Sequence, residues 1–256
     1  MTYKGIGEYR AITLTTGVDV LTGTANNDTF VATDSTYNTG DSLTGGAGTD
    51  TLGLTLGGAN TAVVTLSGVE NVSINDYSGV TVNGANWTGV TGLVFGNSTA
   101  ATTVNNVAAI PTVTLNKTAH NVTVTLNAST VAGASDAATI TMNGLTDNAK
   151  TVTLNGIETL TLNAITADSK FRVADTGLKA LVVTGDKQLD VSAAALNTTV
   201  TSVDASAKTA GGFLADLTGS TLTSVKGGLV TIPSCSLVPL LELPLSMVAL
   251  VLILWG

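Results

Sequence analysis

The chain has 256 residues and a net charge of −8, with 44% hydrophobic, 11% charged and 4% aromatic residues. The hydrophobic fraction is enough for a sizeable core, whereas the charged and aromatic fractions are low for a soluble enzyme. This balance argues against nucleic acid as a partner, because no basic stripe is present to displace the counterions of a phosphate backbone.

The N-terminal part of the chain is acidic. Residues 1–10 contain no apolar segment of the kind found in cleavable signal peptides. Between Arg10 and Lys117 there is no lysine or arginine, yet the segment contains Asp19, Asp28, Asp34, Asp41, Asp50, Glu70 and Asp76. Such a segment repels itself unless cations neutralise it, so it indicates either a cation-binding region or a solvated acidic surface.

A first repeat lies in this acidic part. Residues 21–30 align without gaps on residues 43–52, 22 residues later, with the shared pattern L-T-G-x-A-x-x-D-T-apolar. Residues 45–52 also match the calcium-binding nonapeptide G-G-x-G-x-D-x-apolar. Its glycines allow a turn that directs backbone carbonyls inward, and its Asp adds a carboxylate.

The repeat predicts a calcium site. Because calcium takes about six to eight oxygen ligands, a second turn must complete the site, and residues 23–28 are the candidate. Asp34 and Asp41 lie in the loop between the two turns and would add further oxygens. The alternative is two tight β-turns in which each Asp only bonds the backbone. The predicted ligands are Gly23, Asn26, Asp28, Gly45, Gly46, Gly48 and Asp50.

A second, looser repeat runs through the rest of the chain. It has a turn residue followed by apolar residues at positions +1, +4 and +6, and its copies are 20 to 27 residues apart. Short alternating runs lie between the copies. The copies start at Gly68, Gly89, Ala109, Asp136, Gly156 and Gly177, with weaker ones at Asn197 and Gly219.

Two strands and two turns in about 21 residues are typical of one solenoid rung. Stacked rungs bury a continuous apolar column and pair each backbone with its neighbours. The sequence therefore predicts an all-β, right-handed parallel β-helix (β-solenoid), with a β-sandwich as the alternative. We expect calcium-binding turns over residues 1–60, the solenoid over residues 61–230, and an apolar tail over residues 231–256.

Several residues invite a catalytic or binding interpretation. His120 is the only histidine, so it cannot build a zinc site, and we expect it in a turn. Trp87 and Tyr77 would stack on a sugar or, as we expect, fill a rung corner. No rung shows a cluster of basic and carboxylate side chains that would suit a glycosidase or lyase.

The composition changes after Gly228. Residues 237–255 are nearly all apolar, interrupted by Pro239, Glu242, Pro244 and Ser246, and are long enough to span a bilayer. The tail is either a membrane anchor or a segment foreign to the native fold, as after a frameshift or truncation. In both cases an exposed apolar run of this length predicts aggregation.

These motifs resemble the RTX-type bacterial surface-layer (S-layer) proteins. Residues 45–52, preceded by residues 21–30, are similar to the RTX repeats of that family. Residues 68–74, 156–162, 178–185 and 201–206 are similar to its repeated strands, so the resemblance covers residues 12–230. Calcium roles carry over to Gly45, Gly46, Gly48 and Asp50, and more weakly to Gly23 and Asp28. A long array of nonapeptides and a C-terminal export segment are missing, as expected of a fragment.

The resemblance implies a calcium-stabilised β-helix, secreted through a type I system, that self-associates into a lattice on the bacterial cell surface. We therefore expect an extracellular structural protein with Ca²⁺ as its cofactor and no enzymatic activity. A membrane is a partner only if residues 237–255 are a genuine anchor. The alternative is a secreted RTX adhesin or a carbohydrate-binding or carbohydrate-active β-helix, with cell-surface polysaccharide as its partner.

Overall fold

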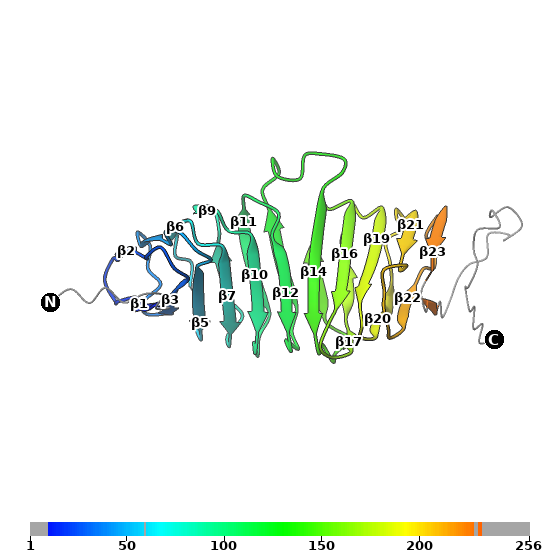
Figure 1. The fold of residues 1–256 in the computed structure, drawn as a ribbon, viewed down its shortest axis with the longest axis horizontal. Helices are drawn as coiled ribbons and strands as arrows, with labels where there is room; N and C mark the ends of the chain where they lie inside the picture. Colours follow the sequence, from blue (N-terminus) through cyan, green and yellow to red (C-terminus); the bar gives the residue numbers. More distant parts are fainter. Residues whose placement is uncertain (1–9, 59, 228–229, 232–256) are drawn as a thin grey trace, which may run out of the picture.

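The computed structural model describes residues 10–58, 60–227 and 230–231, which coil into an elongated stack of parallel strands (Figure 1). No helix occurs among these residues. Equivalent residues of neighbouring turns lie 22, 20 and 21 positions apart, as in the register Phe30–Leu52–Val72–Leu93. The predicted all-β parallel solenoid with rungs of about 21 residues is therefore confirmed.

The longest wall of the stack is an 11-stranded parallel sheet. Its strands, in spatial order, are β1 (Arg10–Thr13), β3 (Asp28–Thr33), β5 (Thr51–Leu56), β7 (Asn71–Asp76), β10 (Gly92–Gly96), β12 (Thr112–Asn116), β14 (Ala137–Asn143), β16 (Thr159–Ala164), β19 (Ala180–Gly185), β21 (Ser202–Asp204) and β23 (Ser224–Lys226).

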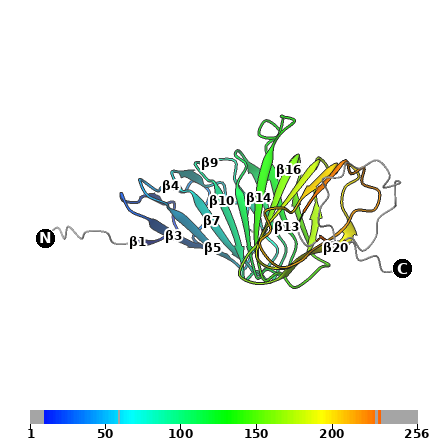
Figure 2. The same ribbon diagram turned by 45° about the vertical axis from the view of Figure 1, so that its right-hand side comes forward.

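Three shorter parallel sheets form the remaining walls, and Figure 2 shows the turns following one another from β1 toward β20. One contains β2 (Val20–Thr22), β4 (Ser42–Thr44), β6 (Thr65–Ser67) and β9 (Trp87–Thr88). The next contains β8 (Thr81–Asn83), β11 (Thr102–Val107), β13 (Val122–Leu126), β15 (Thr151–Leu154) and β18 (Arg172–Ala174). The last contains β17 (Ser169–Lys170), β20 (Leu189–Ala195), β22 (Phe213–Asp216) and β24 (Val230–Thr231).

The core is a column of apolar side chains along the solenoid axis. Strand residues alternate between the two faces of a sheet, so one residue in two points inward. Full burial of one such side chain contributes about 2–3 kcal/mol, and the column repeats this gain at every rung. The inward column of the long sheet comprises Phe30, Leu52, Val72, Leu93, Val113, Ile140, Leu162 and Val183, each at most 1% exposed.

The register departs from the sequence alignment at two steps. The repeat pattern aligned Ile140 with Leu160, whereas Ile140 pairs with Leu162. Similarly, Leu181 pairs with Val203, two residues beyond the aligned position. Because the side-chain period of a strand is two, a shift of two residues keeps every apolar side chain inside, so the pattern alone does not distinguish the two registers.

Of the remaining expectations, two are confirmed, one is wrong and one is untested. His120 lies in a bend between β12 and β13, and Trp87 is buried in the core at 5% exposure. Tyr77 is 47% exposed, so the expectation that it fills a rung corner is wrong. Nearly all of the apolar tail, including residues 237–255, lies outside the described residues. Within the described ranges, no helix has the length and apolarity that a membrane crossing requires.

Candidate metal centre

Three carboxylates stack where the first rungs enter the long sheet. Thr29 pairs with Thr51 and Thr51 with Asn71, so the preceding residues Asp28, Asp50 and Glu70 occupy equivalent positions in three successive rungs. Neighbouring parallel strands are about 4.8 Å apart, which keeps the three side chains close together. We call Asp28, Asp50 and Glu70 the carboxylate ladder.

Each step of the ladder is a hydrogen bond from backbone to side chain. The backbone N–H of Asp28 donates to Asp50 Oδ1 at 2.7 Å, and the N–H of Asp50 donates to Glu70 Oε2 at 2.7 Å. Asp28 is 1% exposed and Asp50 is 0% exposed. One oxygen of Asp50 and one of Glu70 are thus used to tie successive rungs together, and these buried charges need further compensation.

The first turn supplies part of this compensation itself. Both the backbone N–H and the hydroxyl of Thr24 donate to Asp28 Oδ2, the hydroxyl at 2.8 Å. Asp28 Oδ1 is buried and has no hydrogen-bond partner among the described residues. In the strand register Asp28 pairs with Arg10 of the first described rung.

The second turn lacks the equivalent donor. Leu21 pairs with Leu43 and Thr22 with Thr44, so Gly46 stands where the first turn has Thr24. Gly46 has no hydroxyl, and Asp50 Oδ2 is buried without a hydrogen-bond partner in the described part of the chain. Asp50 therefore keeps a fully desolvated oxygen that the protein does not satisfy.

Gly45 lies against both Asp50 Oδ2 and the backbone carbonyl of Gly68, which belongs to the third rung. A Cβ on Gly45 would lie 2.4 Å from Asp50 Oδ2 and only 1.8 Å from the carbonyl oxygen of Gly68. Only glycine permits so close an approach. An unsatisfied carboxylate oxygen and a backbone carbonyl oxygen therefore both lie against the α-carbon of Gly45.

The electrostatics of Asp50 follow from this arrangement. Burial raises the pKa of Asp50, the hydrogen bond from Asp28 opposes the shift, and the charges of Glu70 and Asp28 add to it. None of the ion pairs in the described residues involves a ladder carboxylate. A proton or a bound cation is what remains to compensate the charge.

A second stack of carboxylates provides a contrast. The N–H of Asp136 donates to Glu158 Oε2 at 2.8 Å, which repeats the geometry of the first ladder. The next rung, however, places Lys179 with its Nζ 3.8 Å from Glu158 Oε1. In the carboxylate ladder the equivalent position after Glu70 is the neutral Thr91. A lysine thus stands beside the second stack where the first has none.

The structure brings the two predicted turns together but not all of the predicted oxygens. Gly48 stacks directly on Asn26, since a Cβ on Gly48 would lie 2.8 Å from the Asn26 carbonyl carbon. Gly46 and Gly48 have φ of +111° and +118°, as expected of a glycine turn. Gly23 adjoins Asp28, whose Oδ2 lies 2.7 Å from a Cβ placed there. Asn26 itself is exposed on the turn.

Asp34 and Asp41 lie away from the ladder. Asp41 precedes β4, whereas Asp50 follows it, and Asp41 Oδ1 accepts the N–H of Asp19 at 2.8 Å in a separate stack. Asp34 Oδ2 accepts the N–H of Gly57 at 2.6 Å beyond the end of β3. Both side chains serve their own turns, so the prediction that they supplement the calcium site is not supported by their positions.

The metal-ligating side chains alone do not make a closed site. No group of three or more His, Cys, Asp or Glu side chains converges on one point in the described ranges. Backbone carbonyls would have to supply the balance of ligands, which is the usual practice for calcium. Gly68 and Glu70, which sequence reasoning missed, are the residues that complete the arrangement. Their signal was the Leu66-Ser67-Gly68 triplet, which matches Leu43-Thr44-Gly45 in register.

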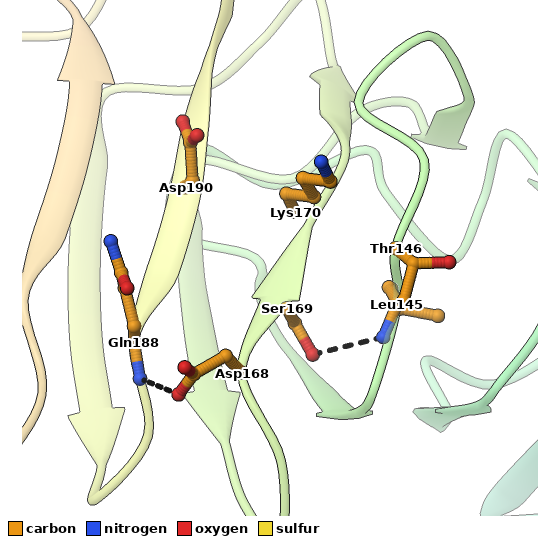
Figure 3. A pocket seen from close by; sticks show the side chains of 7 residues that line it. All are labelled: Leu145, Thr146, Asp168, Ser169, Lys170, Gln188 and Asp190. Atoms are coloured by element: carbon orange, nitrogen blue, oxygen red, sulfur yellow. Dashed lines mark hydrogen bonds between the residues drawn. The ribbon is translucent and has the colours of Figure 1, made fainter.

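A separate cavity of about 220 Å³ lies farther along the stack, around β17 and β20 (Figure 3). Lys170 pairs in register with Asp190, and Asp168 Oδ1 accepts the N–H of Gln188 at 2.8 Å. Sequence reasoning found no basic and acidic cluster within one rung, and the structure assembles this one from two adjacent rungs. The lining residues are Leu145, Thr146, Asp168, Ser169, Lys170, Gln188 and Asp190.

Comparison with known proteins adds no family to this description. Neither the family models nor the curated proteins compared with the chain match it. The RTX and surface-layer resemblance therefore stays a hypothesis based on the residues quoted for it.

Proposed function

We propose that the protein is a structural, non-enzymatic component of a bacterial cell surface, an S-layer-like β-solenoid whose N-terminal turns are locked by calcium. The observation that supports this proposal is the carboxylate ladder. It stacks three acidic side chains in successive rungs, with Asp28 and Asp50 buried and Glu70 partly buried, and no ion pair of the described residues includes any of them. A cation bound only by the folded state stabilises that state, and the stabilisation grows with the logarithm of the cation concentration once this exceeds the dissociation constant.

The small number of carboxylates in the ladder suits the weak calcium binding of extracellular proteins. Extracellular modules bind calcium with dissociation constants of about 10⁻⁴–10⁻³ M, which requires few carboxylates and a turn rich in carbonyls. Such a protein would reach the cell surface through a type I system and fold where calcium is available. Self-association through the long walls of the solenoid would then build the lattice.

The test is calcium-dependent assembly of the full-length chain. Light scattering and negative-stain electron microscopy are compared in calcium and in chelator, and ordered sheets are expected only in calcium. Asp50→Asn is the control, because it retains the apolar tail and any aggregation caused by that tail. Identical particles in calcium and chelator, or ordered sheets from the Asp50→Asn chain, would contradict the proposal.

A second candidate function is glycan binding by an adhesin-like solenoid, and the cavity at Lys170 supports it. Lys170 and Asp190 line this cavity from adjacent strands together with Leu145, and this mixture of charged and apolar side chains suits one sugar residue with its hydroxyls and its apolar face. Screening the protein and its Lys170→Ala variant against immobilised glycans tests this candidate. A screen without hits, or hits unaffected by the substitution, would reject it.

A further inference from the structure

We propose that the calcium ion binds between the second and third rungs, at Asp50 Oδ2, the Gly68 carbonyl and Glu70, and not between Asp28 and Asp50. This inference rests on the proposed calcium-dependent function and deepens it by naming the site. The sequence motif predicts the other position, because only the turns at residues 23–28 and 45–50 resemble the nonapeptide.

The difference between the two turns places the ion. Thr24 already satisfies Asp28 Oδ2 with its N–H and its hydroxyl, so a cation at that oxygen would have to displace two hydrogen bonds, and Asp28 has only Oδ1 unpartnered. Gly46 provides no hydroxyl, and Asp50 Oδ2 is left buried without a partner. The replacement of Thr24 by Gly46 between one rung and the next thus exchanges a hydrogen-bond donor for an open ligand position.

The third rung supplies the remaining oxygens. The Gly68 carbonyl oxygen and Asp50 Oδ2 both lie against the α-carbon of Gly45, 1.8 Å and 2.4 Å from where a Cβ would stand. Glu70 uses Oε2 to accept the N–H of Asp50, and its Oε1 accepts no hydrogen bond from the described residues. Two carboxylates and a carbonyl in adjacent rungs are a ligand set for a hard cation, and flexible backbone ligands favour calcium over magnesium.

The second stack supports the assignment independently. Where Lys179 follows Glu158, an ammonium group already lies 3.8 Å from the carboxylate. Where Thr91 follows Glu70, no such charge is provided. Each stack leaves one Asp oxygen unpartnered, Asp50 Oδ2 in the first and Asp136 Oδ2 in the second, but only the second has a lysine beside its Glu. A bound calcium ion would compensate the charge of Glu70 as Lys179 compensates that of Glu158.

Isothermal titration calorimetry of the full-length chain with CaCl₂ tests the site. Glu70→Gln keeps an oxygen to accept the Asp50 N–H but loses the charge, and we expect its calcium affinity to fall about tenfold or more. Glu158→Gln is the matched control in the second stack and is expected to bind as the wild type does. Asp28→Asn, outside the proposed site, is expected to retain affinity within about threefold.

The outcomes separate the two proposals. Wild-type affinity in Glu70→Gln, or a loss in Asp28→Asn as large as that in Glu70→Gln, would overturn the inference and leave calcium-dependent function standing. The absence of calcium binding by the wild type would reject both. Circular dichroism checks folding, and if Glu70→Gln does not fold, the Asp28→Asn titration decides: retained affinity supports the site and lost affinity rejects it.

Discussion

Replacing Asp50 by Asn should abolish most of the stabilisation by calcium and raise the stability of the chain in chelator. The Asn Oδ1 can still accept the N–H of Asp28, while its Nδ2 takes the place of the unpartnered Oδ2 beside the Gly68 carbonyl and can donate to it. In chelator the variant gains about 1 kcal/mol from this hydrogen bond and loses the repulsion from Glu70 and Asp28. We therefore expect it to be more stable than the wild type when calcium is absent.

In calcium the order of stability of the two proteins should invert. At a calcium concentration of about 100 times the dissociation constant, the wild type gains about 2.7 kcal/mol, whereas the variant has lost a ligand and gains little. The wild type then becomes the more stable protein. For a chain of this size, each kcal/mol corresponds to about 2–4 °C in melting temperature, so both differences are measurable.

The fluorescence of Trp87 during denaturant titration is the appropriate assay. Trp87 is buried in β9, whose neighbour β6 belongs to the rung that contains Gly68, so it reports the local opening expected of a repeat protein. The sequence has one other tryptophan, Trp255. For this assay it is replaced by Phe both in the reference chain and in each variant, so that Trp87 is the sole tryptophan. The reasoning is refuted if Asp50→Asn is less stable than the wild type in chelator, or if calcium still stabilises it.

Asp41→Asn is the matched control. Asp41 is as deeply buried as Asp50, but both of its oxygens accept backbone N–H groups, from Asp19 at 2.8 Å and from Asn38 at 2.7 Å. Its substitution leaves one of these donors without an acceptor and should cost about 1–3 kcal/mol. The cost should be the same in calcium and in chelator, because Asp41 lies outside the ladder.

Three further predictions address the packing and titration of the same region. Gly45→Ala should destabilise the chain by about 1–3 kcal/mol, because its Cβ would lie 1.8 Å from the Gly68 carbonyl, whereas Gly53→Ala, whose Cβ has its nearest neighbour at 3.7 Å, should be nearly neutral in chemical denaturation. Leu52→Ala should cost about 2–5 kcal/mol, because the side chain is 0% exposed in the core column, and an unchanged denaturation midpoint would contradict this packing. The raised pKa of Asp50 means that its contribution is fully favourable below the ordinary carboxyl pKa and is lost as pH rises through the folded-state pKa. Unfolding of the chelated protein across pH 3–8 should therefore show this loss in the wild type and not in Asp50→Asn, and identical pH profiles for the two would count against it.

The fold was predictable because each rung of the solenoid repeats the same pattern of inward-facing apolar residues. Apolar residues at alternating positions, such as Val72 and Ile74, recur every 20–22 residues in most rungs and are buried in every rung between the first and the last described strands of the long sheet. The exact register at Ile140 was not predictable, because a slip of two residues leaves the inside and outside of the strand unchanged.

The candidate site was predictable only in part. The turns containing Asp28 and Asp50 stand out as an aligned repeat, and the structure stacks them as expected. Glu70 follows Asp50 by 20 residues in a segment that lacks the nonapeptide pattern, so only the strand register places it in the ladder. The different roles of Thr24 and Gly46 depend on which oxygens remain unpartnered, and no sequence pattern encodes that.

A crystal structure of the full-length chain grown in calcium, with a lanthanide soak measured at its absorption edge, tests the site most directly. The account predicts one anomalous peak within ligand distance of Asp50 Oδ2, the Gly68 carbonyl and Glu70, and none beside Glu158. A peak confined to the Asp28 and Asp50 turns, or bound ions only at surface carboxylates elsewhere, would contradict it.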